Sequence, residues 1–379
     1  MGICRIFACM EHDDTVYACA LGMIFSSKAS AAVSIMEHFG SPREIFGLSP
    51  KEMTEIFGKR STVPEALRDG EYLIAAEQEV ELARQNGIDI IYFRDKEYPS
   101  RLRTCPDAPI IIYRKGNADL NPEKSIAIVG TRKPSAYGLG QCRKIVETLS
   151  LSGLRPAIVS GLAYGIDICA HRAALEYGLP TFGIMATGMD RIYPWAHRGD
   201  AERIIGHGCL LSDFPTGTKP VAFNFIRRNR IIAGMCDAIV VIESGIKGGS
   251  MITANLGISY SREIFALPGR ITDRLSAGCN VLLEKNSAWA ISSPESIIRN
   301  MGWETVSKNT RQKRWKEIFE RCSPVQRNIL LSLADKSPLD LDSIIGDNGG
   351  DTASILSGLT ELEMEGAIET DLYGNYYLK

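Results

Sequence analysis

Between residues 125 and 267 the chain alternates short apolar segments with longer segments in which apolar residues recur at helical spacing. Short apolar runs bounded by glycine or proline are typical of buried strands. We predict strands at Ser125–Val129, Ala157–Ser160, Thr181–Met185, Cys209–Leu211, Ala238–Ile242 and Ile264–Leu267, and helices at Tyr137–Ser152, Ile166–Tyr177 and Ser250–Tyr260. Strands that are buried on both faces and alternate with helices predict a doubly wound, Rossmann-like α/β sheet.

The segment before this core has a different pattern. Residues 1–65 contain short apolar stretches separated by Gly-Ser-Pro and Leu-Ser-Pro turns, which predicts a small helical module of the SAM or helix-hairpin-helix type. A helix at Asp69–Asn86 and strands at Ile88–Tyr92 and Ile110–Tyr113 lead into the core. Together with the core at 125–290, this helix and these two strands define a Rossmann-like domain over residues 66–298.

The segment after the core is predicted to be a second, smaller domain. Residues 299–321 are expected to form a basic linker. Residues 322–379 contain a helical pattern at Ser323–Ala334, a loop rich in Asp and Gly, a second helix at Thr352–Glu365, and a terminal hairpin formed by Ala367–Thr370 and Tyr376–Leu378. Two helices followed by a hairpin predict a winged-helix domain.

Charge is distributed unevenly along the 379 residues, although the net charge is only -2. Residues 125–290 have a net charge of +6, whereas residues 322–379 have a net charge of -7. The core is therefore the part expected to bind an anion. No run of eighteen apolar residues is present, so no membrane contact is predicted. Ten scattered cysteines without a C-x-x-C motif indicate reduced thiols in the cytoplasm and no metal site.

The most informative segment is the basic block at residues 223–234. It places Arg227, Arg228, Asn229 and Arg230 directly after two phenylalanines, Phe223 and Phe225. Arginine donates hydrogen bonds to phosphate in a planar arrangement, and aromatic rings offer faces on which bases stack. This segment predicts a binding site for a nucleic acid.

Further candidate residues follow the predicted strands. Glycine-rich loops come after four of them, and the carboxyl ends of parallel strands share one edge of a sheet, where ligands bind. A helix N-terminus or a glycine nest at this edge can hold phosphate. The DNA-binding candidates in these loops are Gly130, Thr131, Arg132, Lys133, Ser160, Gly161, Lys247, Gly249 and Ser250.

Several kinds of catalytic site are disfavoured. The first strand is not followed by G-x-G-x-x-G, and no P-loop or G-x-S-x-G motif occurs, so neither a dinucleotide cofactor nor any other cofactor is expected. Asp167 and His171 have the i, i+4 spacing of an acid–base pair. Such a pair more often stabilises a helix start, and both residues are interpreted as structural.

The motifs of the core resemble the DNA-processing protein A family, also known as DprA or Smf. The matching segments keep the family's order over residues 125–290. They are Val129-Gly130-Thr131-Arg132, Ser160-Gly161-Leu162-Ala163-Tyr164-Gly165-Ile166-Asp167, Tyr193-Pro194, Leu211-Ser212-Asp213-Phe214-Pro215, Arg228-Asn229-Arg230 and Gly249-Ser250-Met251-Ile252-Thr253-Ala254. Two residues depart from the family pattern. Tyr164 stands where some members have a basic residue, and Gly248 stands where the family usually has a serine.

The resemblance implies an extended Rossmann-like domain that binds single-stranded DNA and forms a homodimer. It also implies a protein without catalysis that protects incoming single strands and loads the RecA recombinase onto them during natural transformation or recombination. Carried over by position, the pocket residues would be Gly130, Arg132, Ser160, Gly161, Arg228, Asn229 and Arg230.

Two other functions stay open at this point. A nucleotide or nucleoside-monophosphate hydrolase could have a related fold, and Glu243 lies close to the glycine pair Gly248-Gly249. Alternatively, the winged helix could read duplex DNA. Its 3 basic and 10 acidic residues disfavour contact with phosphates and suggest that it contacts protein.

Overall fold

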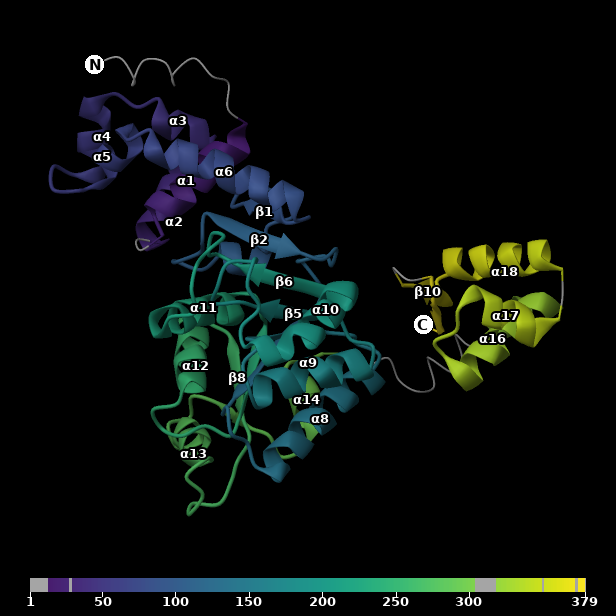
Figure 1. Ribbon diagram of the computed structural model, residues 1–379. Helices are drawn as coiled ribbons and strands as arrows, with labels where there is room; N and C mark the ends of the chain where they lie inside the picture. Colours follow the sequence, from purple (N-terminus) through teal and green to yellow (C-terminus); the bar gives the residue numbers. More distant parts are fainter. Residues whose placement is uncertain (1–12, 27–28, 304–317, 350, 372–373, 379) are drawn as a thin grey trace. The chain divides into compact units, whose positions relative to one another are not determined.

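The computed structural model describes residues 13–26, 29–303, 318–349, 351–371 and 374–378 (Figure 1). The chain divides into two compact units, Met1–Glu304 and Thr305–Lys379. Most of the predicted basic linker, residues 304–317, lies outside the described residues. Over the described ranges, no helix combines the length and the apolar character that crossing a membrane requires.

The first unit is built on a nine-stranded sheet with the order β1-β2-β6-β5-β4-β3-β7-β8-β9. The seven strands from β6 to β9 run parallel, and β1 and β2 add an antiparallel edge next to β6. The predicted doubly wound, Rossmann-like sheet is confirmed. The strands are β1 (Asp89–Tyr92), β2 (Ile111–Lys115), β3 (Ser125–Gly130), β4 (Ala157–Ser160), β5 (Thr181–Ile184), β6 (Gly208–Ser212), β7 (Ala238–Ile242), β8 (Glu263–Ala266) and β9 (Trp289–Ala290).

Helices cover both faces of this sheet, because alternate residues of the central strands point to opposite sides. Ile126 and Ile128 of β3 pack in one cluster with α8, α9 and α14, whereas Ala127 and Val129 pack in another with α11 and α12. The helices of this part are α8 (Ala136–Leu151), α9 (Ile166–Glu176), α10 (Arg198–His207), α11 (Ala222–Gly234), α12 (Gly249–Ser259), α13 (Ala277–Glu284) and α14 (Pro294–Asn300).

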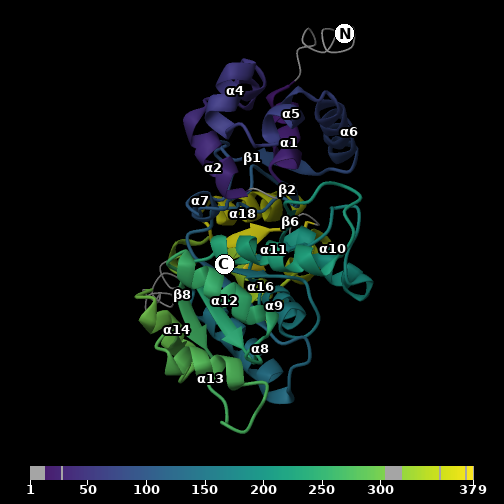
Figure 2. The ribbon, with the colours of Figure 1, turned by 90° about the vertical axis from the view of Figure 1, so that its left-hand side faces the viewer.

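The N-terminal helices pack against the β1–β2 end of the sheet (Figures 1 and 2). Leu21 of α1 and Ile112 of β2 lie in the same buried cluster as the core of the sheet, so the helical module and the sheet share one hydrophobic interior. The helices are α1 (Asp14–Ile24), α2 (Ala29–His38), α3 (Pro42–Phe46), α4 (Pro50–Phe57), α5 (Val63–Arg68), α6 (Glu71–Gln85) and α7 (Ser100–Arg103).

The second unit has the helices and the hairpin of a winged-helix domain. Its helices are α16 (Pro324–Lys336), α17 (Leu341–Asn348) and α18 (Thr352–Met364), and its hairpin pairs β10 (Ile368–Thr370) with β11 (Tyr376–Leu378). Helix α17 replaces part of the loop that the sequence predicts there. Asp340 caps this helix by accepting a hydrogen bond from the Ser343 N–H, and Ile344 is buried in the domain core.

Candidate nucleic-acid interface

The candidate residues gather where the parallel strands end. The chain runs outward from β3 through β4, β5 and β6 on one side and then through β7, β8 and β9 on the other, so the order reverses between β3 and β7. Ligands of doubly wound sheets bind beside the carboxyl ends of strands at such a reversal. The loops after β3 and β7 therefore form the centre of the candidate site.

The loop after β3 is held in place by Glu243, which directly follows β7. Thr131 donates its N–H to the Glu243 carbonyl at 2.7 Å, and the Ser135 N–H and hydroxyl both donate to the Glu243 carboxylate, the N–H at 2.8 Å. A Cβ atom on Gly130 would lie 2.0 Å from the Ile242 carbonyl, so only glycine allows this close packing. Ser135 also caps α8 by accepting from the Gly138 N–H at 3.1 Å.

This arrangement corrects the expectation that a phosphate binds at the N-terminus of α8. The buried Glu243 carboxylate lies against this helix start: a Cβ atom on Gly138 would come within 2.5 Å of a Glu243 oxygen. A negative side chain is stabilised by the free N–H groups and the positive end of the helix dipole. The protein therefore fills this position with its own anion.

Arg132 and Lys133 are directed outward by the same loop. Both side chains are exposed, and the Arg132 guanidinium lies 5.4 Å from the centre of the Phe225 ring. Phe225 is half-buried at the start of α11 and also contacts the ring of Tyr193, with 5.6 Å between the ring centres. Basic groups and aromatic faces thus lie side by side at the carboxyl edge.

Arg228, the central arginine of the basic block, is buried with 4% of its surface exposed. Its guanidinium donates to the carbonyl oxygens of Gly161, at 2.5 Å, and Ile184, which follow β4 and end β5. Burial lowers the pKa of Arg228 to about 10. Burial also raises the pKa of Asp167, and the positive charge of Arg228 opposes that rise. The prediction that Arg228 contacts phosphate is not supported, because this arginine joins α11 to two strand ends.

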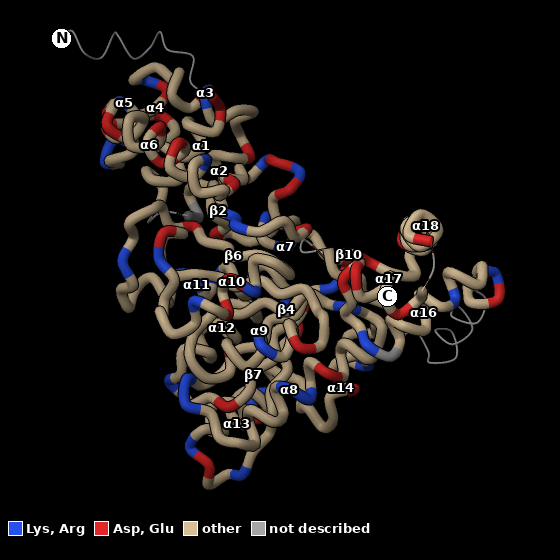
Figure 3. Tube along the Cα trace, turned by 45° about the vertical axis from the view of Figure 1, so that its right-hand side comes forward, with Lys and Arg blue, Asp and Glu red and all other residues tan. Residues whose placement is uncertain are grey.

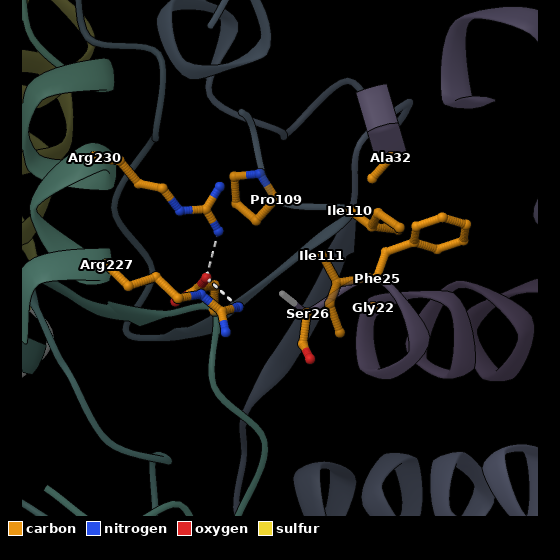
Figure 4. Close-up of a pocket in the computed structure, with 10 residues that line it drawn as sticks. Gly22, Phe25, Ser26, Ala32, Pro109, Ile110, Ile111, Arg227 and Arg230 are labelled. Carbon is orange, nitrogen blue, oxygen red and sulfur yellow. Dashed lines mark hydrogen bonds and ion pairs between the residues drawn. The ribbon is translucent and has the colours of Figure 1, made fainter. Parts of the chain in front are cut away.

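Arg227 and Arg230 point toward a small pocket between α11 and the N-terminal helices (Figure 4). Both pair with the buried Asp213 carboxylate, Arg230 at 2.6 Å and Arg227 at 2.9 Å. Arg230 is only 5% exposed. One carboxylate between two guanidinium groups leaves a net charge of +1, and Asp213 directs both arginines into this contact. Their role in holding phosphate stays a prediction.

The pocket beside these arginines has a volume of about 20 Å³. Two nitrogens of Arg230, Nε and Nη1, and the Oδ1 atom of Asp213 have no hydrogen-bond partner among the described protein atoms. A space of this size holds one water molecule, and a buried water binds to two to four polar partners. We therefore expect an ordered water to complete this contact between α11 and the helical module.

Other aromatic side chains extend the exposed surface. Phe223 is 67% exposed, as expected of a stacking residue. Tyr164 follows β4, and Tyr193 and Trp195 follow β5; all three are also exposed. The sequence predicts aromatic stacking only within the basic block and does not single out these three residues. Their positions after strand ends are the signal that identifies them.

The loop after β7 contributes a further basic group. Lys247 and Gly249 are exposed, whereas Ser250 is buried and donates its hydroxyl to the Ser244 hydroxyl at 2.7 Å. The buried Asn229 donates to the Gly249 carbonyl at 3.4 Å, which ties α11 to the start of α12. Lys247 is the exposed charged residue of this loop. Ser160 is also buried, and its hydroxyl donates to the Ile128 carbonyl at 2.6 Å.

Asp167 and His171 are both buried in the packing of α9 against the sheet. The His171 ring hydrogen-bonds to the Thr181 hydroxyl at 2.7 Å, and burial lowers the pKa of His171 to about 3. Asp167 has its pKa raised by burial. Hydrogen bonds from the backbone of Ala163 and Gly161, in the loop after β4, oppose this rise in the pKa of Asp167.

His171 makes the stability of the protein sensitive to acid. Its folded pKa of about 3 lies below the ordinary value of 6.5, so the unfolded chain binds a proton that the folded chain does not. Stability is therefore full above about pH 6.5 and falls as the pH drops toward 3, by about 2 kcal/mol between pH 7.5 and 5. His171→Gln should remove this difference in urea unfolding measured at the two pH values. An equal pH dependence in both proteins would contradict it.

Comparison with known proteins identifies the family. The model of the family "DNA recombination-mediator protein A" matches residues 89–302, more than half of the chain, and the model of the DprA winged helix domain matches residues 322–371. The DNA processing protein DprA of Streptococcus pneumoniae is 38% identical over 203 residues, covering 54% of this chain and 71% of the relative.

Solved structures agree with this. The X-ray structure of DprA from Streptococcus pneumoniae has a TM-score of 0.65 at 30% identity, covering 76% of this chain and 98% of that chain. A structure of DNA processing protein A from Helicobacter pylori, described for its single-stranded DNA binding mode, has a TM-score of 0.51 at 29% identity, covering 56% of this chain and 95% of that chain. The predicted resemblance is confirmed: the chain belongs to the DNA recombination-mediator protein A family, also called DprA or Smf.

Proposed function

We propose that this protein binds single-stranded DNA along the carboxyl edge of its parallel sheet and acts in DNA recombination and transformation. The observation that carries the proposal is a group of basic and aromatic residues, exposed except for the half-buried Phe225, in the loops at this edge and at the start of α11. Figure 3 marks the backbone positions of lysine and arginine in blue. We call this group the edge surface: Arg132, Lys133, Tyr164, Tyr193, Trp195, Phe223, Phe225 and Lys247.

The chemistry of the edge surface favours single strands over duplex. Bases that are unpaired can stack on tyrosine, tryptophan or phenylalanine faces, with about 1–3 kcal/mol for each base, whereas the bases of a duplex are already stacked on each other. The exposed Arg132 and Lys133 supply charges for the phosphates between these bases. The relative from Helicobacter pylori, described by its single-stranded DNA binding mode, supports this choice.

Fluorescence anisotropy with a labelled single-stranded oligonucleotide tests the proposal. Binding should resist a duplex competitor and weaken with salt, with a logarithmic slope of about -0.7 for each phosphate contacted. Equal competition by duplex would contradict the preference for single strands. Absence of binding at low salt would contradict the edge surface as a DNA site.

We further propose that the protein has no catalytic activity of its own. The alternative of a nucleoside-monophosphate hydrolase needs a carboxylate that faces the substrate, and Glu243 is the acid closest to the glycine pair. Its carboxylate is buried and accepts both hydrogen bonds from Ser135, which supports a structural role. Incubation with AMP and GMP should release no free base, and release would revive the hydrolase.

The partners of the DNA-bound protein are part of the same proposal. Family membership supports a cytoplasmic homodimer that protects incoming strands and passes them to RecA. The eight described cysteines are unpaired, as expected in a reducing compartment. Light scattering should give twice the mass of the chain. The protein should also accelerate assembly of RecA on single strands covered by a competing binding protein.

For the winged-helix domain we propose a contact with protein. Helix α18 contains Glu361 and Glu363 and no Lys or Arg over Thr352–Met364, so it would repel the phosphates of a duplex. Removing residues after Arg321 should leave binding of single strands intact and impair dimerisation or the loading of RecA. Unchanged behaviour in all three assays would count against this role.

A further inference from the structure

Helices α8 and α9 pack against each other on one face of the sheet. Each contributes one cysteine to their contact, Cys142 from α8 and Cys169 from α9. The Cys142 thiol contacts the carbonyl oxygen of Ile166 at 4.0 Å, and the Cys169 thiol contacts the carbonyl oxygen of Leu139 at 3.7 Å. Leu139 lies one turn before Cys142 in α8, and Ile166 lies one turn before Cys169 in α9. Each sulfur thus reaches the turn of the opposite helix next to the other cysteine.

The two thiols differ in exposure and in acidity. Cys142 is fully buried, whereas Cys169 is partly accessible to solvent. The pKa of Cys169 is lowered by its hydrogen bond with the Cys142 thiol and, to a smaller extent, by the positive charges of Arg143 and Arg172, against the effect of burial. The same hydrogen bond raises the pKa of Cys142. Cys169 is therefore the more acidic and the more accessible thiol of the two.

The other cysteines of the described residues have a different environment. Burial is the largest cause of a raised pKa at each of them: Cys19, Cys105, Cys209, Cys236, Cys279 and Cys322. A buried thiol with a raised pKa is inert, because the thiolate is the reactive form. A partly exposed thiol with a lowered pKa next to a second cysteine has the features of a site of reversible oxidation.

We propose that Cys169 and Cys142 form a peroxide-reactive pair, in which Cys169 attacks the oxidant and Cys142 resolves the product into a disulfide that links α8 to α9. The Cys169 thiolate attacks one peroxide oxygen, the O–O bond breaks, and the departing oxygen takes a proton and leaves as water or an alcohol. Cys169 is then a sulfenic acid. The Cys142 sulfur attacks this sulfur, the S–O bond breaks, and the hydroxyl leaves with the Cys142 proton as water. The two sulfurs lose two electrons, and the peroxide gains them.

Hydrogen peroxide added to the full-length protein tests the pair. After free thiols are blocked with N-ethylmaleimide, mass spectrometry of the digest should show a peptide containing Cys142 joined to one containing Cys169, lighter by two hydrogen atoms and separated again by dithiothreitol. In the untreated protein, iodoacetamide should label Cys169 at least about tenfold faster than Cys105. Equal labelling, or oxidation of Cys169 with Cys142 left as a free thiol, would overturn the proposal.

Variants assign the two roles. In Cys142→Ser the sulfenic acid at Cys169 should accumulate and be trapped by dimedone, whereas Cys169→Ser should leave Cys142 unreactive. Cys322→Ser, in the other unit, is the matched control and should form the disulfide as the unmodified chain does. Should Cys142→Ser fail to fold, as judged by thermal melting, Cys142→Ala serves the same purpose. Dimedone trapping at Cys142 in Cys169→Ser would refute the assigned order.

Discussion

Arg228→Ala is expected to destabilise the first unit by about 3–5 kcal/mol, because buried and hydrogen-bonded charges cost this much when one partner is removed. The substitution removes the donor shared by the carbonyls of Gly161 and Ile184, and it takes away the positive charge near the buried Asp167. The melting temperature should fall by about 10 °C. Thermal and urea unfolding followed by circular dichroism measure this effect.

Arg84→Ala is the control for this substitution. Arg84 is also a helical arginine paired with a carboxylate, Glu81, but both side chains are exposed. Exposed ion pairs contribute little to stability, so the melting temperature should hardly change. If Arg228→Ala melted like the unmodified protein and lost DNA affinity instead, Arg228 would be a DNA contact, and the structural role assigned here would be wrong.

The second large effect concerns DNA. Replacing Arg132 and Lys133 together by alanine should weaken binding of single strands about 25-fold at 0.1 M salt, because each lost phosphate contact removes about 0.7 from the logarithmic salt slope. The slope itself should become shallower by about 1.4. Both side chains are exposed, so folding should be unaffected. Anisotropy titrations over a series of salt concentrations measure both quantities.

The same Arg84→Ala protein serves as the control for charge. It lowers the net charge of the chain at a position on α6, away from the strand ends, and should keep the salt slope of the unmodified protein. An unchanged slope in the double variant would mean that the phosphates lie elsewhere. Loss of affinity without a change in slope would indicate instead that stacking on Phe225, which Arg132 contacts, has been disturbed.

The strands of the core were predictable because each is a short apolar run, and four of them are followed by a glycine-rich loop. Ala157–Ser160 and Ala238–Ile242 agree with the structure at both ends. Helix α17 was not predicted, since its segment is rich in Asp and Gly, residues that favour turns in isolation. Packing of Ile344 in the domain core and the cap at Asp340 override that preference.

The location of the candidate site was predictable, but the roles of its arginines were not. A sequence shows that Arg228 and Arg230 are charged and follow two aromatic residues. It does not show that Arg230 pairs with Asp213, which lies 17 positions earlier, or that Arg228 donates to backbone carbonyls at the ends of two strands. Such partners are determined by the three-dimensional arrangement of strand ends. The exposed arginine, Arg132, comes from a different loop.

The Glu243 carboxylate at the start of α8 affects how well the protein distinguishes nucleic acid from free nucleotides in the cell. A Rossmann-like sheet that keeps this position open can hold the phosphate of a single nucleotide tightly, and millimolar ATP would then compete with any nucleic acid. Here the position is taken by the protein, and the edge surface offers several separate weak contacts instead. Linked weak contacts gain affinity by avidity only when one molecule spans them. Affinity should therefore rise steeply with the length of the strand, and free nucleotides should be poor competitors.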